Sequence, residues 1–375
     1  MKILHIASFQ GNIGDNASHI GFKNILTELN IDCDVTELEI RKAYNNYTLP
    51  DKVNFDLDFA VYANSFDLVV FGGGGFLDYW VDGSVNGTTI GIDYDVLDAI
   101  DTPILISSVG SNPHRKVPEG NIAKFKKFLD YVKDSPKITI ALRNDNSEAS
   151  WNSDLGDEYS ANVKHILDHG FFYRPRQHLE SIYGDERFAC LNITQDQISM
   201  FNNGNHVKNE EHYYKCLTNI VSYMVDKKEL KVVLVPHIYS DIKAIAHLFD
   251  VLPEFYRRGY VEVAPMLQGN SGADYLFSLY QHAEFVIGSR YHTNVCSLTM
   301  GKPTIGLSPL NRIKHLYDSF GVSDYFHFSY DNFTEGVKQS IDLINRFELD
   351  NVSRIIEKKK EKTLEFYRNY FKELR

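Results

Sequence analysis

The chain has 375 residues and a formal net charge of −11, because 50 Asp and Glu outnumber 39 Lys and Arg. Nucleic-acid-binding proteins need a broad basic surface, so the acidic balance argues against that class of protein. Hydrophobic residues make up 43% of the chain, which is ordinary for a globular protein. The length exceeds what one hydrophobic core usually serves, and we therefore expect two domains.

Other features of the sequence predict a soluble, cytoplasmic protein. No apolar run reaches the ~20 residues that a membrane span needs, and the apolar start of the chain is too short for a signal peptide. The four cysteines lie far apart without a C-x-x-C pair, so we expect reduced thiols, no disulfide and no metal site. These cysteines are Cys33, Cys190, Cys216 and Cys296.

Short apolar runs alternate with amphipathic stretches such as residues 17–29. This alternation predicts βαβ units and a mostly parallel sheet in an α/β fold. The predicted strands are Ile3–Ala7, Leu68–Phe71, Ile104–Val109, Ile138–Leu142, Val232–Val235, Phe285–Ile287 and Pro303–Leu307.

Two regions between these runs have the composition of connecting segments. Residues 147–160 are rich in Asn, Asp, Ser and Gly and predict an exposed loop, and residues 165–187 predict a linker. We therefore place an N-terminal domain at residues 1–178, a second domain at residues 179–345 and a C-terminal helix at residues 346–375.

A glycine-containing turn follows the first predicted strand. Ligands of open α/β sheets bind beyond the carboxyl ends of the strands, beside the N-termini of the following helices. Gly11 and Gly14 permit a tight turn whose backbone N–H groups can face a ligand. Asn12 lies between them, and Asp15 or Asn16 can cap the first helix.

A run of four glycines, Gly72 to Gly75, follows the second predicted strand, with Asp78 close behind. Consecutive glycines are costly in chain entropy, so Gly73 and Gly74 predict a close backbone approach to a ligand or an anion-binding nest. The run is not the G-x-G-x-x-G fingerprint, which argues against NAD. Asp78 is a candidate base, with loop hydrogen bonding as the alternative.

The run Phe285–Ile287 breaks at a glycine and delivers Ser289, Arg290 and His292 to a strand end. Arg290 supplies a fixed cation and His292 a titratable proton carrier, so the segment predicts an anion site beside an acid/base group. The alternative is a structural ion pair for Arg290 and a helix-capping role for His292.

Two further strand ends carry candidate residues. Arg143 is a second strand-end arginine, for which a surface salt bridge is the alternative. His237 also follows a predicted strand, where a lone histidine is more often structural.

Taken in order, these motifs resemble those of the polysaccharide pyruvyl transferases, enzymes that move pyruvate from phosphoenolpyruvate onto sugar hydroxyls. The resemblance extends from residue 1 to about residue 325. Many relatives read Y-D-x-K after the last strand, whereas this chain reads Ser308 to Lys314, so Lys314 or Arg312 stands in for that lysine. The matching residues are Gly11, Asn12, Gly14, Asp15, Gly72 to Gly75, Asp78, Arg143, Ser147, Gly288, Arg290, His292, Gly301 and Pro303.

The resemblance implies a fold similar to the GT-B glycosyltransferases, with two Rossmann-like domains facing across a cleft and a C-terminal helix returning to the first domain. It also implies phosphoenolpyruvate as donor, no cofactor, and a sugar or glycan acceptor that receives a pyruvate ketal. His292, Arg290 and Asp15 would be catalytic. The residues expected to bind substrate are Gly11, Asn12, Gly14, Gly73, Gly74, Asp78, Arg143, His237, Ser289 and Lys314.

Two other functions suit the same fold. One is a glycosyltransferase that uses a nucleotide sugar, although the second domain lacks the paired glutamates with which many such enzymes hold the ribose. The other is a non-catalytic sugar- or phosphosugar-binding protein, which would need no proton carrier such as His292.

The last segment, residues 351–375, carries apolar residues at helical spacing with many lysines between them. We expect a helix that packs its apolar stripe on the first domain, because glutamates dilute the basic face. The alternative is peripheral contact with the inner membrane surface, which would suit a lipid-linked acceptor.

Overall fold

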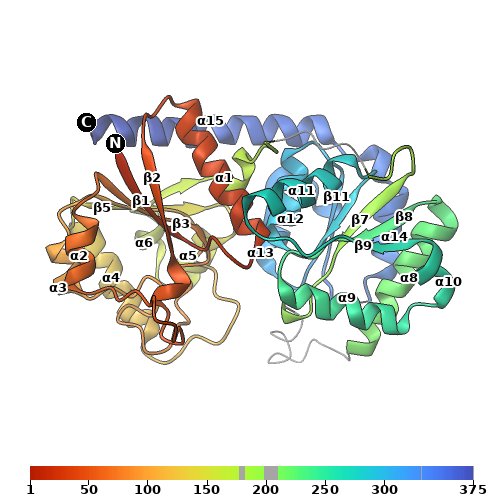
Figure 1. Cartoon of the computed structure of the whole chain (residues 1–375), viewed down its shortest axis with the longest axis horizontal. Coiled ribbons are helices and arrows are strands. Elements are labelled where there is room, and N and C mark those ends of the chain that lie inside the picture. Colours follow the sequence, from red (N-terminus) through yellow and green to blue (C-terminus); the bar gives the residue numbers. More distant parts are fainter. Residues whose placement is uncertain (177–181, 198–209, 331, 375) are drawn as a thin grey trace. The chain divides into compact units, whose positions relative to one another are not determined.

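The computed structural model describes residues 1–176, 182–197, 210–330 and 332–374. The chain forms two compact units, each with its own α/β core (Figure 1). Unit 1 consists of Met1–Gln10, Phe22–His169 and Lys359–Arg375, and unit 2 consists of Gly11–Gly21 and Gly170–Lys358. The chain passes from unit 1 to unit 2 inside the predicted linker, whereas the predicted boundary between residues 178 and 179 lies outside the described residues.

Unit 1 is built on a parallel six-stranded sheet in the order β2-β1-β3-β4-β5-β6. Apolar side chains of these strands are buried against the helices of the unit, as their uninterrupted apolar runs require. The strands are β1 (Lys2–Ala7), β2 (Asp34–Glu39), β3 (Leu68–Gly74), β4 (Ile104–Val109), β5 (Ile138–Arg143) and β6 (Lys164–Ile166). The helices are α2 (Leu57–Ala63), α3 (Tyr94–Ala99), α4 (Asn121–Asp134), α5 (Ser147–Asp154) and α6 (Asp157–Ala161).

The prediction of an exposed loop at residues 147–160 is wrong, because α5 and α6 occupy it. Trp151 of α5 is fully buried, and its indole N–H donates to the Ser111 hydroxyl at 2.7 Å. Gly156 separates the two helices with φ +118°, in the region that favours glycine. The polar composition that suggested a loop belongs to two short helices and the break between them.

Unit 2 is built on a second parallel six-stranded sheet, in the order β12-β11-β10-β7-β8-β9. The strand order reverses between β7 and β10, and ligands of open α/β sheets bind at such a switch point. The strands are β7 (Phe188–Asn192), β8 (Lys231–Leu234), β9 (Val261–Val263), β10 (Val286–Gly288), β11 (Thr304–Leu307) and β12 (Phe326–His327). The helices are α8 (Glu210–Lys228), α9 (Tyr239–Val251), α10 (Glu254–Gly259), α11 (Gly269–His282), α12 (Tyr291–Thr299), α13 (Asn311–Phe320) and α14 (Thr334–Asp342).

Two long helices belong partly to each unit. Helix α1 (Ile13–Glu28) begins in unit 2 and ends in unit 1, and α15 (Leu349–Glu373) does the same. The first residues of α1 pack into a core of unit 2, so the Gly11–Asp15 motif lies in unit 2 although it precedes most of unit 1 in the sequence.

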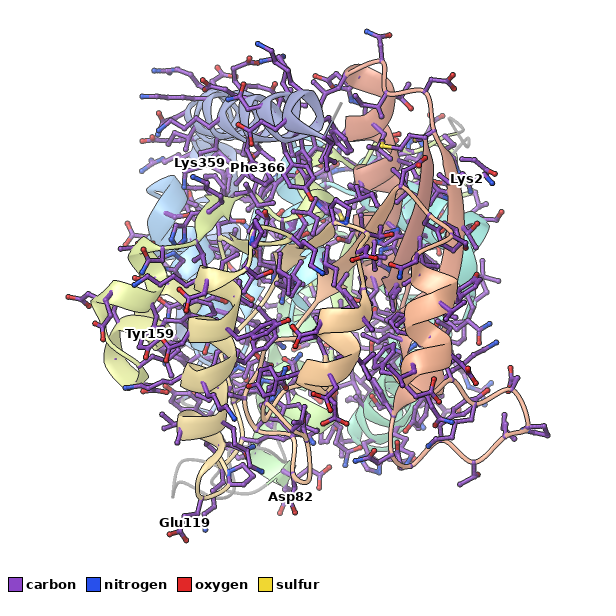
Figure 2. All side chains as sticks on the ribbon, turned by 90° about the vertical axis from the view of Figure 1, so that its left-hand side faces the viewer. Lys2, Asp82, Glu119, Tyr159, Lys359 and Phe366 are labelled. Atoms are coloured by element: carbon purple, nitrogen blue, oxygen red, sulfur yellow. The ribbon has the colours of Figure 1, made fainter. Side chains whose placement is uncertain are left out.

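The C-terminal part of α15 packs on unit 1, as predicted. Figure 2 shows Lys359 and Phe366 on the side of α15 that faces the rest of this unit. The buried Tyr367 hydroxyl forms hydrogen bonds with Ser107 of β4 and with Nε2 of His169. Burial lowers the pKa of Lys359, and the nearby charge of Lys362 lowers it further. Among the described residues, no helix combines the length and apolarity that crossing a membrane requires.

Candidate functional site

The switch point of unit 2 is held together by Asn192 at the end of β7. Its backbone oxygen accepts a hydrogen bond from the Ser289 N–H at 3.1 Å, and its side-chain oxygen accepts one from the Arg290 N–H at 3.0 Å. The Asn294 side chain donates to the carbonyl oxygens of Gly288 and Arg290 at 3.0 and 2.7 Å. The turn from β10 into α12 is therefore fixed on both sides.

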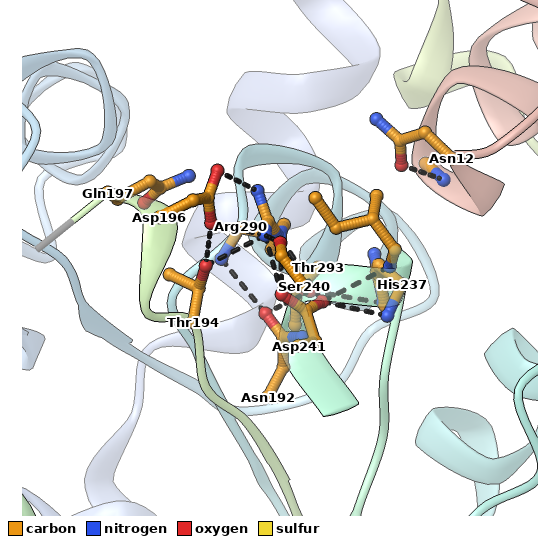
Figure 3. A network of polar contacts seen from close by, with 12 residues as sticks. Asn12, Asn192, Thr194, Asp196, Gln197, His237, Ser240, Asp241, Arg290 and Thr293 are labelled. Carbon is orange, nitrogen blue, oxygen red and sulfur yellow. Dashed lines mark hydrogen bonds and ion pairs between the residues drawn. The ribbon is translucent and has the colours of Figure 1, made fainter. Parts of the chain in front are cut away.

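Arg290 precedes α12, and two carboxylates hold its guanidinium group (Figure 3). Nε donates to both oxygens of Asp241 at 3.1 and 3.2 Å, and Nη2 donates to Asp241 at 2.5 Å and to Asp196 at 2.7 Å. Nη2 also lies 2.7 Å from the Thr194 hydroxyl, and Nη1 lies 3.4 Å from Asp196. The guanidinium is thus the centre of an ion-pair cluster.

The charges of this cluster are strongly coupled. Burial lowers the pKa of Arg290, but Asp241 and then Asp196 outweigh it and raise the pKa above its ordinary value. Burial raises the pKa of Asp196, but the charge of Arg290 outweighs it and holds the pKa below its usual range. One guanidinium and two carboxylates give the cluster a net negative charge. This arrangement matches the alternative considered for Arg290, a structural ion pair. The role of Arg290 as a donor clamp stays a prediction.

His292 and Asp15 come together in unit 2 from the first turns of α12 and α1. Nδ1 of His292 lies 3.9 Å from Oδ1 of Asp15. Gly14 makes this approach possible, because a Cβ there would lie 2.8 Å from the His292 Cβ. The Gly14 N–H donates to the Asn12 side-chain oxygen at 2.9 Å, which shapes the turn. A carboxylate beside an imidazole can orient the ring.

His237 lies fully buried beneath this arrangement. Nε2 lies 2.7 Å from the Tyr280 hydroxyl and 3.2 Å from the Thr293 hydroxyl, and the His237 carbonyl accepts from the Ile13 N–H at 3.3 Å. Burial lowers the pKa of His237 well below its usual value, and the charges of Arg290 and His292 lower it further. His237 is therefore neutral near pH 7, and its predicted role in substrate binding is untested.

Arg143 at the end of β5 is buried in unit 1 and also pairs with two carboxylates. Nε lies 2.7 Å from Asp145, and Nη1 lies 3.2 Å from Asp168. Both carboxylates are at most 1% exposed. Ser147, matched to the family motif, donates its hydroxyl hydrogen to Asp145 and accepts from the Ser111 N–H. In the structure Arg143 contributes to a buried polar network, and its predicted contact with substrate stays a prediction.

A second histidine–aspartate pair lies in unit 1 beyond the end of β3. Oδ1 of Asp78 accepts from the Asn112 N–H at 2.7 Å, and Oδ2 lies 3.9 Å from Nδ1 of His114. The His114 ring meets the Trp80 indole edge-on, and the guanidinium carbon of Arg115 lies 4.5 Å from the centre of that indole. Sequence reasoning missed His114 and Trp80, because neither lies in a recognised motif.

At several positions of the glycine run, the local backbone or a neighbouring side chain favours glycine. Gly73 has φ +73°, and a Cβ on Gly74 would lie 2.6 Å from the Phe76 ring. A Cβ on Gly75 would come within 2.9 Å of the Asp78 carboxylate. These contacts explain the glycines without a ligand, so their predicted part in substrate binding is untested.

The other predicted residues have separate surroundings. Lys314 on α13 is 45% exposed and pairs with Asp318 at 2.6 Å on the same helix. Ser289 is buried at the switch point, and Gly11 is exposed in the turn before α1, with φ +80°. The structure thus brings together Asn12, Gly14, Asp15, His237, Ser289, Arg290 and His292 in unit 2.

Solved structures with a similar fold include the pneumococcal O-GlcNAc transferase GtfA in complex with UDP and GlcNAc, which is 9% identical to this chain. For GtfA the TM-score is 0.57, and the match covers 100% of this chain and 99% of that chain. The UDP-GlcNAc 2-epimerase from Methanocaldococcus jannaschii is 10% identical with a TM-score of 0.53, covering 95% of this chain and 99% of that chain. The UDP-GlcNAc 2-epimerase from Neisseria meningitidis bound to UDP-GlcNAc is 12% identical with a TM-score of 0.52, covering 97% and 100%. At these identities the likeness concerns the fold, which is α/β and of the GT-B type.

A search of curated proteins found no match. The family model for polysaccharide pyruvyl transferase, in contrast, matches residues 12–311, from the turn before α1 to the start of α13. The match includes the strand-end motifs of both units. The chain belongs to the polysaccharide pyruvyl transferase family.

Proposed function

We propose that this protein transfers the pyruvyl group of phosphoenolpyruvate to two hydroxyls of a sugar or glycan and forms a cyclic ketal. Family membership supports the reaction class. The placement of His292 beside Asp15 carries the assignment, because ketal formation from an enol phosphate needs a proton carrier. Asp15 and His292 lie in the first turns of the helices that follow β1 and β10, and ligands of open α/β sheets bind beside such helix N-termini.

The reaction begins with protonation of the donor. His292 in its charged form delivers a proton to the methylene carbon, which becomes a methyl group, and C2 becomes electrophilic. One acceptor hydroxyl adds to C2 and loses its proton to His292. The bond between C2 and the phosphate oxygen then breaks, and a second hydroxyl closes the ring while its proton passes to the departing phosphate.

The surroundings of His292 suit this proton transfer. Oδ1 of Asp15 lies 3.9 Å from Nδ1 of His292, so that a small rotation of either side chain lets the carboxylate accept from the ring N–H and orient the imidazole. The N-termini of α1 and α12 favour negative charge, as borne by the donor's carboxylate and phosphate.

The test is a product assay with purified protein, phosphoenolpyruvate and a panel of mono- and disaccharide acceptors. We expect inorganic phosphate release that depends on the acceptor, together with a new ketal methyl signal by NMR, and loss of both in His292→Asn. Release of nucleotide from a UDP-sugar, without phosphate release from phosphoenolpyruvate, would instead identify a glycosyltransferase. Absence of both products would contradict catalysis on these substrates.

A further inference from the structure

The two carboxylates that hold Arg290 differ in how firmly the protein holds them. Asp241 is fully buried in the first turn of α9, and its Oδ2 also accepts from the N–H groups of His237 and Ile238 at 2.9 and 3.3 Å. Asp196 lies after β7, is 31% exposed, accepts from the Thr194 hydroxyl and faces Arg290 through one bond of 2.7 Å and one of 3.4 Å. Solvent therefore reaches only one of these two partners.

The cluster as it stands has a net negative charge and would repel an anionic donor. Removal of Asp241 would leave the buried guanidinium without its main partner and two backbone N–H groups without an acceptor, which is costly. Movement of Asp196 would instead free Nη1 and the N–H of Nη2 that now donates to Asp196, while Nη2 keeps its bond to Asp241. These freed N–H groups can grip a carboxylate or phosphate. Its side chain can turn into water, where a charged carboxylate is well solvated.

We propose that Asp196 occupies the place of the donor's anionic group on Arg290 and is displaced when the donor binds. This inference rests on the proposed function, because it takes phosphoenolpyruvate as the ligand. Asp241 is then the permanent partner that orients the guanidinium, and Asp196 is a built-in competitor that sets the affinity for the donor.

Arg143 in unit 1 provides a contrast. Its two carboxylate partners, Asp145 and Asp168, are both buried, so neither can move into water without opening the core of the unit. Asp196 differs from these partners of Arg143 because solvent reaches its side chain. Asp196 also lies at the switch point of unit 2.

The test is calorimetric binding of phosphoenolpyruvate, and separately of inorganic phosphate, to Asp196→Asn. Asparagine keeps the size of the side chain but removes the charge, so we expect binding about tenfold tighter than in the wild-type protein. Asp342→Asn is the matched control, because it removes one exposed carboxylate of unit 2 that pairs with Lys228, away from Arg290. We expect no change in that variant.

The double variant Asp196→Asn/Arg290→Gln should lose the gain, because the competing carboxylate acts through the guanidinium. Equal or weaker binding of both ligands by a folded Asp196→Asn protein would overturn the inference, as would a gain that survives in the double variant. Tighter binding of phosphate but no binding of phosphoenolpyruvate would contradict the proposed donor while supporting the displacement of Asp196.

Discussion

Replacing Asp241 by asparagine tests whether the Arg290 cluster holds unit 2 together. The substitution changes one oxygen to an NH2 group and removes the charge, at a side chain that is fully buried. Asp241 accepts from Nε and Nη2 of Arg290 and from the N–H groups of His237 and Ile238. In the variant Arg290 keeps only its ion pair with the part-exposed Asp196.

The expected cost follows from these contacts. Breaking a buried ion pair by removing one partner typically costs about 3–5 kcal/mol, because the remaining charge stays buried without compensation. Asp196 still offsets part of the Arg290 charge, so we expect about 3 kcal/mol of unfolding free energy. For a unit of this size that is a fall of roughly 6–12 °C in melting temperature.

The assay is thermal unfolding followed by circular dichroism, with Asp342→Asn as control. Asp342 forms an exposed pair with Lys228, and exposed pairs contribute about 0–1 kcal/mol, so that variant should melt within ~4 °C of the wild type. If Asp241→Asn also melts within this margin, the cluster does not stabilise unit 2 and the reasoning is refuted.

Further predictions concern activity, pH, the C-terminal helix and the glycine run. His292→Asn should lower turnover by about 10²–10⁴ with unchanged melting temperature, and an equal loss of stability would indicate a structural role. Burial lowers the pKa of His327 to about 4 from 6.5, so the unfolded state binds more protons between these values and stability should fall as the pH drops from 6.5 to 4. Urea unfolding should show that the free energy of unfolding falls by roughly 2–3 kcal/mol between pH 6.5 and pH 4. An equal fall in a His327→Gln variant would show that His327 does not cause it. Deleting residues 351–375 should cause aggregation, because it uncovers apolar surface of unit 1; a stable truncated protein that no longer sediments with anionic vesicles would favour the membrane alternative. Gly74→Val should distort the turn beside Phe76, and an unchanged melting temperature and near-UV spectrum would show that the turn tolerates the side chain.

Much of the fold could be predicted because the central strands are uninterrupted apolar runs. β1, β3, β4 and β10 are buried along almost their whole length, so each stands out from the surrounding sequence. Strand β7 (Phe188–Asn192) was missed although it is central and fully buried, because its short run directly follows the predicted linker. Strand β2 was missed because it is largely exposed and its sequence, Asp34–Glu39, is mostly polar. Edge strands of this kind carry little hydrophobic pattern.

The candidate site divides in the same way. Arg290 and His292 could be found because they follow a clear strand, as the architecture requires of ligand-binding residues. The partners of Arg290 could not, because Asp241 and Asp196 lie 49 and 94 residues away and are brought near by β8 and β7. Contacts that arise from the order of strands in a sheet leave no characteristic spacing in the sequence.

The pairing of Asp15 with His292 was hidden for a related reason. Asp15 stands near the start of the chain, yet the first turns of α1 belong to unit 2 and the rest of the helix to unit 1. Sequence order suggested that the opening motif serves the N-terminal domain. The tertiary packing of Ile13 and Ala17 in the core of unit 2 decides otherwise.

The most direct test of pyruvyl transfer is to run the reaction in D2O and examine the product by NMR. Protonation of the methylene carbon by His292, whose ring hydrogen exchanges with solvent, predicts a ketal methyl group that carries one deuterium, CH2D. The His292→Asn protein should form this product far more slowly. A ketal methyl group without deuterium, or a product that keeps the methylene group, would contradict the account.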